Sequence, residues 1–363
     1  MKLHHFKILL IGPLPPPLTG VSLANQVVSE YLPKQHNIQL QTINTGLKVL
    51  KEDIGKFNLK KTLFYTKQYS QLGKIFKTDK VYATPGQTFF GVLKYYPYFL
   101  ISKIAGKEII FHVHGNYLGT EYQQLSGIKK KLFKHVVSMS DKGIVLSKSL
   151  KTNLSPFLPE NKIYVLKNFA EDFLFDTSIK KDFSKLKIIY LSNLMKEKGI
   201  LDLLDALIIL KEKNINFEAK IAGGMDAFLK PEIEKKLKTL NQQVEYLGIV
   251  KGEEKKQLLT WGNIFVFPTY YQMEGQPISI FEAMATGNII LTTRHAGIPD
   301  IFEEGKNGFY IEKKSPESIV NKLMELKENL SGYQYISENN QTEAQENYRV
   351  QSFIDNLYQI LNA

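Results

Sequence analysis

The stretch Glu274-Gly-Gln-Pro-Ile-Ser-Ile-Phe-Glu282, which continues as Ala283-Met-Ala-Thr-Gly287, is the part of the chain around which the rest is organised. It places two carboxylates eight positions apart. Glu274 follows an apolar segment, Ile264 to Phe267, that has the character of a buried strand. Glu282 lies inside a short expected helix that Gly287 ends. The sequence therefore predicts a strand, a loop carboxylate and a helical carboxylate in succession.

The entrance of this expected helix favours an anion. Pro277 fixes φ where the chain turns into the helix, and the backbone N–H groups nearby meet the positive end of the helix dipole. Those N–H groups belong to Gly275, Gln276 and Ile278. A nucleotide sugar suits this arrangement, because Glu274 can accept hydrogen bonds from sugar hydroxyls and Glu282 can take both hydroxyls of a ribose. The alternative is local: Ser279-x-x-Glu282 is also a capping box, and Glu274 could be a solvated loop residue.

Length and composition indicate a two-domain globular protein. The chain has 363 residues, of which 43% are hydrophobic and 23% charged, and a single core rarely grows to that size. No apolar run approaches the roughly 18–20 residues of a membrane span, and the N-terminus lacks the pattern of a signal peptide. The sequence has no cysteine, which excludes disulfides and thiolate metal sites. We expect a cytoplasmic protein.

Charge is distributed unevenly along the chain. Residues 1–167 carry 24 lysines against 8 acidic residues, whereas the remainder carries 23 basic against 28 acidic residues. The first half therefore suits an anionic partner such as a lipid diphosphate or an anionic membrane surface, peripheral to the inner face. Nucleic acid is disfavoured, because only Arg294 and Arg349 among the 47 basic residues could read base edges as arginines do. The alternative is a solvated, lysine-rich surface.

The first half alternates apolar segments with helical patterns. Lys7 to Gly12 reads as a buried strand and passes through a Pro-rich loop to Gly20, where a helix is expected to begin. Glu108 to Val113 reads as a later strand that ends at His114 and Gly115, and ligands of doubly wound sheets bind beyond such strand ends. We also expect helices over 62–75 and 89–105, the latter interrupted at Pro97. A basic amphipathic helix is expected around Lys129 to Lys134, as a membrane-facing element or a solvated face.

The second half repeats the α/β pattern. An apolar strand, Leu186 to Leu191, leads to Asn193-Leu-Met-Lys-Glu-Lys198-Gly199 and then to a helix. Lys198 stands where a phosphate would meet a point charge beside helical N–H groups. The chain thus predicts α/β domains at 1–167 and 186–345, a linker at 168–185 and a C-terminal helical segment at 346–363 that returns to the first domain.

These residues resemble a known family. The Glu274/Glu282 pair, the segment Ser192-Asn-Leu-x-x-Glu-Lys-Gly199, the block Ala296-Gly-Ile-Pro-Asp-Ile and Gly305-x-Asn-Gly308 are similar to the motifs of family 4 retaining glycosyltransferases of the bacterial polysaccharide type. The resemblance is dense from about residue 186 to 312 and loose in the first domain. It implies the GT-B fold, in which two Rossmann-like domains face each other across a cleft, with an acceptor-binding first domain and a nucleotide-sugar-binding second domain.

The resemblance also implies a role for each candidate residue. Glu282 would hold the ribose, Glu274 the donor sugar, Lys198 the diphosphate, and His114 would lie beside the reaction centre as a catalytic residue with Glu274. The remaining donor-binding positions are Gly20, Asn193, Val250, Gly275, Gln276, Pro277 and Ile278. Asn193 stands where the family usually has Arg, which removes a fixed charge from the diphosphate site.

The implied activity is transfer of a hexose or N-acetylhexosamine from a nucleotide-diphosphate sugar, with a UDP-sugar favoured, to a glycan or lipid-linked acceptor. No metal and no cofactor are expected, because no Asp-x-Asp pair follows a strand and positive groups could neutralise the leaving diphosphate. The alternatives are a catalytically silent glycosyltransferase-like partner subunit, which Asn193 keeps open, and a nucleotide-sugar 2-epimerase of the same fold. An NAD-dependent oxidoreductase is disfavoured, since Gly-x-Gly-x-x-Gly is absent.

Overall fold

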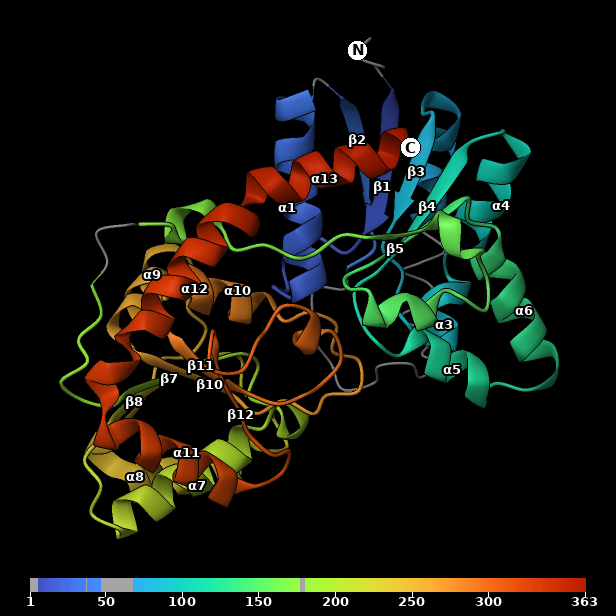
Figure 1. Cartoon of the computed structure of the whole chain (residues 1–363). Helices are drawn as coiled ribbons and strands as arrows, with labels where there is room; N and C mark the ends of the chain where they lie inside the picture. The colour runs from blue at the N-terminus through green and yellow to red at the C-terminus, as the bar shows by residue number, and fades with distance from the viewer. Residues whose placement is uncertain (1–5, 37, 47–67, 177–179) are drawn as a thin grey trace. The chain divides into compact units, whose positions relative to one another are not determined.

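The computed structural model describes residues 6–36, 38–46, 68–176 and 180–363 (Figure 1). The chain divides into two compact units. The first unit comprises Met1–Asn168, Met273–Gln276 and Gln351–Ala363, and the second comprises Phe169–Gln272 and Pro277–Val350. The domain limits set out above, and the role given to each domain, remain predictions.

The first unit is built on a parallel six-stranded sheet. Its strands Lys7–Gly12 and Glu108–Val113 are almost continuous apolar runs, as expected where helices cover both faces. The strands of the sheet are β1 (Lys7–Gly12), β2 (Gln39–Asn44), β3 (Lys80–Ala83), β4 (Glu108–Val113), β5 (Lys142–Val145) and β6 (Ile163–Val165). Their spatial order is β2-β1-β3-β4-β5-β6. The order reverses between β1 and β3, and in doubly wound sheets ligands bind beyond the carboxyl ends of the strands at such a switch point.

The helices of the first unit are mostly short. They are α1 (Gly20–His36), α3 (Phe89–Leu93), α4 (Tyr96–Ile104), α5 (Leu118–Gln124) and α6 (Gly127–Ser138), with 3₁₀ helices η1 (Tyr69–Lys77), η2 (Ser149–Asn153) and η3 (Glu160–Lys162). The helix expected over 89–105 is split, and Pro97 lies in the first turn of α4, where its missing N–H costs nothing. The helix expected over 62–75 lies in part outside the described residues, and its end forms η1 instead.

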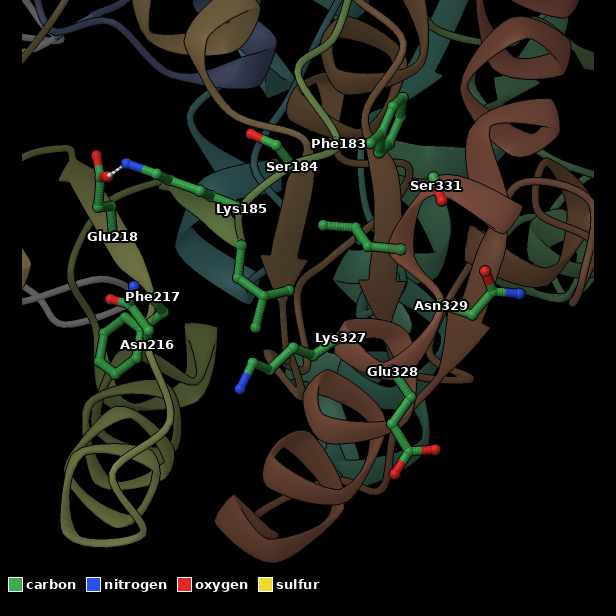
Figure 2. Close-up of a pocket in the computed structure, with 12 residues that line it drawn as sticks. Phe183, Ser184, Lys185, Asn216, Phe217, Glu218, Lys327, Glu328, Asn329 and Ser331 are labelled. Carbon is green, nitrogen blue, oxygen red and sulfur yellow. Dashed lines mark ion pairs between the residues drawn. The ribbon is translucent and has the colours of Figure 1, made fainter.

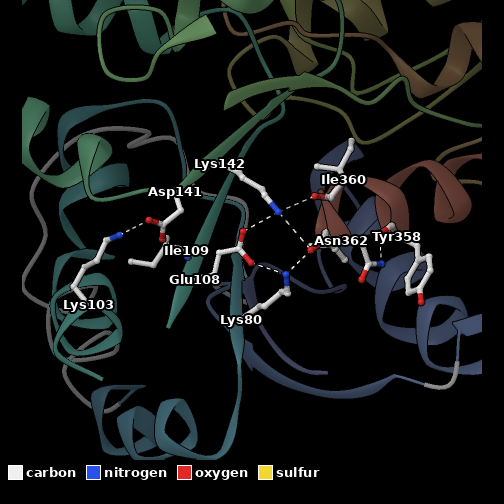
Figure 3. A network of polar contacts seen from close by, with 10 residues as sticks. Lys80, Lys103, Glu108, Ile109, Asp141, Lys142, Tyr358, Ile360 and Asn362 are labelled. Atoms are coloured by element: carbon white, nitrogen blue, oxygen red, sulfur yellow. Dashed lines mark hydrogen bonds and ion pairs between the residues drawn. The ribbon is translucent and has the colours of Figure 1, made fainter. Parts of the chain in front are cut away.

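The last helix, α13 (Val350–Asn362), completes the first unit, as expected for the C-terminal segment. It lies beside α1 (Figure 1), where the rings of His36 and Tyr358 stack with centroids 3.9 Å apart. Its carboxyl end is held by a cluster that we call the first ion trio: Lys80, Glu108 and Lys142 (Figure 3). Each of these residues begins a strand, so the trio lies at the amino edge of the first sheet.

The first ion trio has one carboxylate between two ammonium groups. Glu108 Oε2 lies 2.5 Å from Lys80 Nζ, and Glu108 Oε1 lies 2.8 Å from Lys142 Nζ. Burial would raise the pKa of Glu108, but the hydrogen bonds from Lys142 and Lys80 outweigh burial and lower that pKa. Lys142 also donates to the carbonyl of Ile360 at 3.1 Å, and Lys80 donates to the carbonyl of Leu361. The trio therefore caps the negative end of the α13 dipole.

The second unit contains another parallel six-stranded sheet with a different order. Its strands are β7 (Lys187–Leu191), β8 (Glu218–Ala222), β9 (Val244–Tyr246), β10 (Ile264–Phe267), β11 (Ile289–Thr292) and β12 (Gly308–Tyr310). The order is β12-β11-β10-β7-β8-β9, which is that of a Rossmann sheet. Its switch point lies between β7 and β10, so the loops that leave these two strands frame the expected ligand position.

Helices pack around the second sheet and share one large core with it. They are α7 (Ile200–Glu212), α8 (Lys230–Leu240), α9 (Gly252–Trp261), α10 (Ile278–Ala285), α11 (Pro316–Glu328) and α12 (Gln334–Asn347), with 3₁₀ helices η4 (Asp172–Leu174), η5 (Lys196–Lys198), η6 (Asn241–Gln243), η7 (Ile298–Asp300) and η8 (Leu330–Tyr333). None of the helices among the described residues is long and apolar enough to span a bilayer.

Candidate functional site

The loops after β7 and β10 meet at the switch point of the second sheet. The backbone N–H of Tyr270 donates to the carbonyl of Glu197 at 2.8 Å. The loop after β7 ends at Gly199, whose φ is 78°. A Cβ on Gly199 would lie 2.4 Å from the carbonyl oxygen of Pro268, in the loop after β10. Only glycine tolerates both the left-handed conformation and this close approach. These two constraints explain why a glycine follows Lys198 in the sequence motif.

Lys198 lies at this meeting point, as the last residue of η5 before α7. Its Nζ is 4.8 Å from the ring centre of Tyr271 and 5.5 Å from that of Phe267, so two aromatic faces flank the ammonium group. Gly199 is the N-cap of α7 and no side chain caps this helix end. A half-buried cation beside a helix N-terminus is suited to a diphosphate.

Asn193 lies on the other side of the same loop. A Cβ on Gly223 would lie 1.7 Å from the carbonyl oxygen of Ser192, and a Cβ on Gly224 would lie 3.4 Å from the side-chain oxygen of Asn193. The loops after β7 and β8 therefore pass each other closely. Val250 is buried in the loop after β9, and Gly248 in that loop accepts a hydrogen bond from the N–H of Gly223. Asn193 and Val250 are thus carried by loops that are linked through the end of β8.

Glu282 is buried within α10 and is not a helix cap. The helix begins at Ile278 with Pro277 as its N-cap, and no side chain caps it, so the capping-box alternative is wrong. The Glu282 residue is 4% exposed. A carboxylate so deeply buried needs a partner, and the structure supplies one that sequence reasoning did not find.

That partner is Lys255, in the first turn of α9. Its Nζ lies 2.5 Å from Glu282 Oε1 and also contacts Glu171 Oε2. We call Glu171, Lys255 and Glu282 the second ion trio. Burial disfavours the ammonium form of Lys255, but attraction by Glu282 and Glu171 outweighs burial and raises the pKa of Lys255. A sequence signal existed, because Lys255 shares a helical face with the buried Leu258 and Leu259.

Residues 273–276, which include Glu274, pack with the first unit. Gln87 Nε2 donates to the carbonyl of Met273 at 3.3 Å, and a Cβ on Gly275 would lie 2.6 Å from the carbonyl oxygen of His114. The structure therefore brings the Glu274 loop to the carboxyl end of β4. Glu274 itself is 7% exposed, which is uncommon for a loop carboxylate and does not fit an ordinary solvated position.

Gln276 is held in place by hydrogen bonds to the end of the first unit. Asn168 Nδ2 donates to the Gln276 carbonyl at 2.8 Å, and the Asn168 N–H donates to Gln276 Oε1 at 3.2 Å. Pro277 and Ile278 then start α10 in the second unit. The stretch with which the sequence analysis opened is thus where the chain passes from one unit to the other.

His114 and His112 lie on the same side of β4, as the alternation of a strand predicts. Their ring centres are 3.9 Å apart, and His112 Nδ1 is 2.6 Å from the hydroxyl of Tyr82 on β3. Burial lowers the pKa of His114 to about 3. Burial and the neighbouring His114 together hold the pKa of His112 well below its usual value. Both imidazoles are therefore neutral near pH 7.

Gly20 begins α1 at the switch point of the first sheet. The preceding Thr19 and the following Ser22 cap each other: the N–H of Thr19 donates to Ser22 Oγ at 2.8 Å, and the N–H of Ser22 donates to Thr19 Oγ1 at 3.1 Å. Gly20 lies exposed between them. The loop is thus ordered by its own side chains, with the glycine at its surface.

A cavity of about 320 Å³ lies elsewhere in the second unit (Figure 2). Segments 183–186, 216–218 and 327–331 line it, and Lys185 and Glu218, from the first two of these segments, form an ion pair at 3.6 Å. The first two segments precede β7 and β8, so the cavity lies at the amino edge of the sheet. Every predicted donor residue of the second unit lies toward the opposite edge, and the cavity is not the candidate site.

Within the described part of the chain, no group of three or more His, Asp or Glu residues is arranged to hold a metal ion. The absence of a metal requirement stays a prediction, because a diphosphate can itself bring a cation.

Comparison with known proteins identifies the second half of the chain. Residues 174–343 match the family described as "Glycosyl transferases group 1". The chain is 30% identical over 159 residues to the putative colanic acid biosynthesis glycosyltransferase WcaL of Salmonella typhimurium, and 28% identical over 179 residues to the amylovoran biosynthesis glycosyltransferase AmsK of Erwinia amylovora. These matches cover 41% and 46% of this chain, and 38% and 42% of the relatives. The chain thus spans less than half the length of either relative.

Solved structures show that the similarity of fold extends over the whole chain. The structure of Anabaena HepE in complex with UDP and glucose superposes with a TM-score of 0.75 at 17% identity, covering 99% of this chain and 100% of HepE. Sucrose-phosphate synthase from Thermosynechococcus elongatus superposes with a TM-score of 0.73 at 13% identity, covering 99% and 98%. The GT-B fold expected from the sequence is confirmed.

Proposed function

The chain belongs to the glycosyl transferases group 1 family, and on that premise we propose that it transfers a sugar from a nucleotide-diphosphate donor to an acceptor hydroxyl with retention of anomeric configuration. The donor is a UDP-hexose or UDP-N-acetylhexosamine, and the acceptor is a glycan or lipid-linked oligosaccharide of a bacterial surface polysaccharide. The relatives named for colanic acid and amylovoran biosynthesis support this class of acceptor. The HepE complex with UDP supports the choice of base.

One observation carries the proposal: Glu282 is a buried carboxylate that is not used as a helix cap, on the helix that follows β10 at the switch point. A carboxylate in this position can accept hydrogen bonds from the two ribose hydroxyls. Lys198 meets the diphosphate from the loop after β7, the neighbouring strand. The diphosphate of one nucleotide thus has a partner on the loop after β7, and its ribose has a partner on the helix after β10.

The barrier to sugar transfer lies in charge that develops on the sugar and on the departing diphosphate. Lys198 and the helical N–H groups stabilise the leaving group, which is usually the largest catalytic contribution. Glu274 orients the sugar hydroxyls. His114, neutral because burial lowers its pKa to about 3, acts beside the sugar as a hydrogen-bonding group and not as a cation. We assign no covalent nucleophile.

Gly20 and residues 275–278 supply backbone N–H groups to the diphosphate and sugar, and Val250 flanks the base. Asn193 lacks the charge that arginine would bring to the diphosphate, so Lys198 carries a larger share of the neutralisation. The same substitution supports a second candidate, a catalytically silent partner subunit.

A thermal-shift screen with UDP-, GDP- and ADP-sugars tests the donor, because a ligand that binds only the folded state raises its stability by mass action. We expect a shift with the UDP-sugar and none for Glu282→Ala. Product analysis then separates sugar transfer from epimer formation, and a shift without either product indicates the silent subunit. Equal shifts in the parent and in Glu282→Ala would overturn the role of Glu282.

The acceptor part of the proposal includes docking on an anionic membrane. Helices α4 and α6 contain lysines and no acidic residue, and they expose apolar side chains: Ile104 is 77% and Ile128 83% exposed. Exposed apolar groups among lysines suit an anionic bilayer surface. We expect flotation with anionic vesicles at low salt, weakened when Lys129, Lys130 and Lys131 are replaced by Gln. Flotation equal to that with neutral vesicles would contradict membrane docking.

A further inference from the structure

The second ion trio carries an excess negative charge in a place from which water is largely excluded. Two carboxylates share the single ammonium group of Lys255, which is 6% exposed. The side chain of Glu171 is 26% exposed and is therefore partly solvated, whereas that of Glu282 is 5% exposed. A single ammonium group cannot fill all the acceptor sites of two carboxylates, and those that Glu282 keeps are buried, which is costly without further hydrogen-bond donors.

The position of Lys255 is not explained by the stability of its own helix. Lys255 lies in the first turn of α9, where the helix dipole favours acidic residues such as the adjacent Glu253 and Glu254. A cation there is placed against the dipole, and the two carboxylates are what compensate it. Its ammonium group also lies 5.4 Å from the ring centre of Phe173, next to the segment that carries Glu171.

Among the residues that the structure describes, Lys255 is the contact of the Glu282 carboxylate, and it uses Oε1. One oxygen is thus fixed, and both oxygens keep further acceptor capacity. Two adjacent hydroxyl groups are the donors that complete such a carboxylate.

Glu171 ties the cluster to the crossover between the units. The N–H of Ala170 donates to the carbonyl of Tyr348 at 2.8 Å, and Ala170 forms a parallel bridge with Arg349. These are the segments beside which the chain leaves the first unit, after Asn168, and returns to it, after Val350. The second ion trio therefore connects α10 and α9 to both crossing segments.

We propose that Lys255 is a positioning residue for donor recognition: it holds the Glu282 carboxylate in place for the ribose hydroxyl pair and anchors it, through Glu171, to the crossing segments. This inference rests on the proposed function, in which Glu282 binds ribose. It predicts that loss of Lys255 weakens the recognition of the ribose hydroxyls in particular, and not of the nucleotide as a whole.

The test compares nucleotides with and without these hydroxyls. Binding of UDP, GDP and ADP to the full chain is measured by calorimetry, and the tightest of them is compared with its 2′,3′-dideoxy analogue. The parent protein should prefer the ribose form by roughly ten- to a hundredfold, the size expected of hydrogen bonds to a charged group. Lys255→Met should lose most of this preference, with little change in the affinity for the dideoxy analogue, and Lys255→Arg should restore part of it.

Two further variants guard against misfolding and non-specific effects. Lys255→Met combined with Glu171→Gln removes one charge of each sign, so that the cluster keeps its overall charge, and it should still lack the preference. Lys256→Met is the matched control, because Lys256 is the next residue of α9 and pairs with Asp176 at 3.1 Å without touching Glu282; it should retain the preference.

The outcomes separate the two proposals. If the parent protein and Glu282→Gln show the same ribose preference, or if none of the three nucleotides binds, the ribose role of Glu282 fails and this inference fails with it. If the parent prefers ribose and Glu282→Gln does not, while both Lys255→Met proteins keep the preference, the role of Lys255 is overturned and the proposed function stands. Equal weakening of both nucleotide forms by Lys255→Met also overturns the positioning role.

Discussion

The two units each bury an ion trio, and the two trios have opposite excess charge. In the first unit, Lys80 and Lys142 share the carboxylate of Glu108, which leaves one positive charge in excess. The carbonyl groups of Ile360 and Leu361, at the negative end of α13, accept hydrogen bonds from these lysines (Figure 3). In the second unit, Lys255 is shared by Glu171 and Glu282, which leaves one negative charge in excess.

The difference separates a structural cluster from a candidate binding cluster. The first trio is completed by the protein's own backbone, so its charges hold a helix in place. For the second trio, no hydrogen-bond donor to the Glu282 carboxylate other than Lys255 is recorded within the described residues. A buried carboxylate with unused acceptor sites indicates a place for a ligand, whereas a cluster completed by the protein's own groups does not. Four predictions test this comparison, from the largest expected effect to the smallest.

Replacing Lys255 by Met should produce the largest loss of stability. The change leaves Glu282 buried without a cation, and breaking a buried ion pair in this way costs about 3–5 kcal/mol of unfolding free energy. The single tryptophan, Trp261, ends α9 in the second unit, so its fluorescence during urea unfolding follows that unit. Lys256→Met, which removes a more exposed pair, should cost no more than about 1 kcal/mol; equal losses in the two variants would contradict the importance of the second trio.

Replacing Lys142 by Met should destabilise the first unit by about 2–3 kcal/mol, the size expected for loss of charged hydrogen bonds in a buried position. Glu108 keeps Lys80, so no charge is left alone and the effect is smaller than for Lys255. Circular dichroism should show the loss while the Trp261 transition moves less. The control is Lys103→Met, which breaks a more exposed pair with Asp141. A transition that moves equally in both probes would show that the two units unfold together.

Acid should weaken the first unit before the second. Burial lowers the pKa of His114 to about 3 from its usual 6.5, so the unfolded chain binds more protons between these values and stability falls as pH falls through that range. By about pH 5 this histidine alone should cost about 2 kcal/mol. His114→Gln should remove that part of the loss, measured by urea unfolding at pH 7 and pH 5.

Lys255 adds no such dependence in the same range. The pKa of Lys255 is raised above its usual 10.5, so its contribution to stability is complete below that value and is lost only as pH rises through the raised pKa. An acid-side slope that is unchanged in His114→Gln would contradict a histidine that is kept neutral by burial.

Glu171→Gln should cause the smallest change in nucleotide affinity and in stability. The change removes the partly exposed carboxylate and makes the second trio neutral, so Lys255 attracts Glu282 alone and weakens it as an acceptor for hydroxyl groups. We expect nucleotide affinity to fall roughly threefold and stability to change by less than about 1 kcal/mol, as for other partly exposed charges. Tighter nucleotide binding in this variant would show that the excess charge has no part in recognition.

Features that depend on residues near one another in the sequence, such as the strands and the turn at Gly199, were predictable. Features that depend on the order of strands in the sheet were not. Apolar runs identified both sheets, and the Lys198-Gly199 turn was recognisable because glycine is required there by a positive φ and a close approach. The order of strands was not predictable, because crossover connections leave no periodic signal, and so neither switch point could be located beforehand.

The second trio was missed for the same reason. Its members are 84 and 27 positions apart along the chain, and no local pattern links Glu171 to Lys255 or Lys255 to Glu282. The Glu274 loop was predicted as part of the second domain's site, yet its residues 273–276 pack with the first unit. Local sequence identified Glu274 as a candidate but could not show which unit surrounds it.

The discontinuity of the first unit has a consequence for biosynthesis. Its sheet emerges from the ribosome early, but α13, which supplies the carbonyl groups for Lys80 and Lys142, is translated after the whole of the second unit. During synthesis the ammonium groups of Lys80 and Lys142 therefore stay hydrated until residues 351–363 have been translated. The first unit is thus translated first but completed last, and a factor that binds the nascent chain would bind this unit without α13.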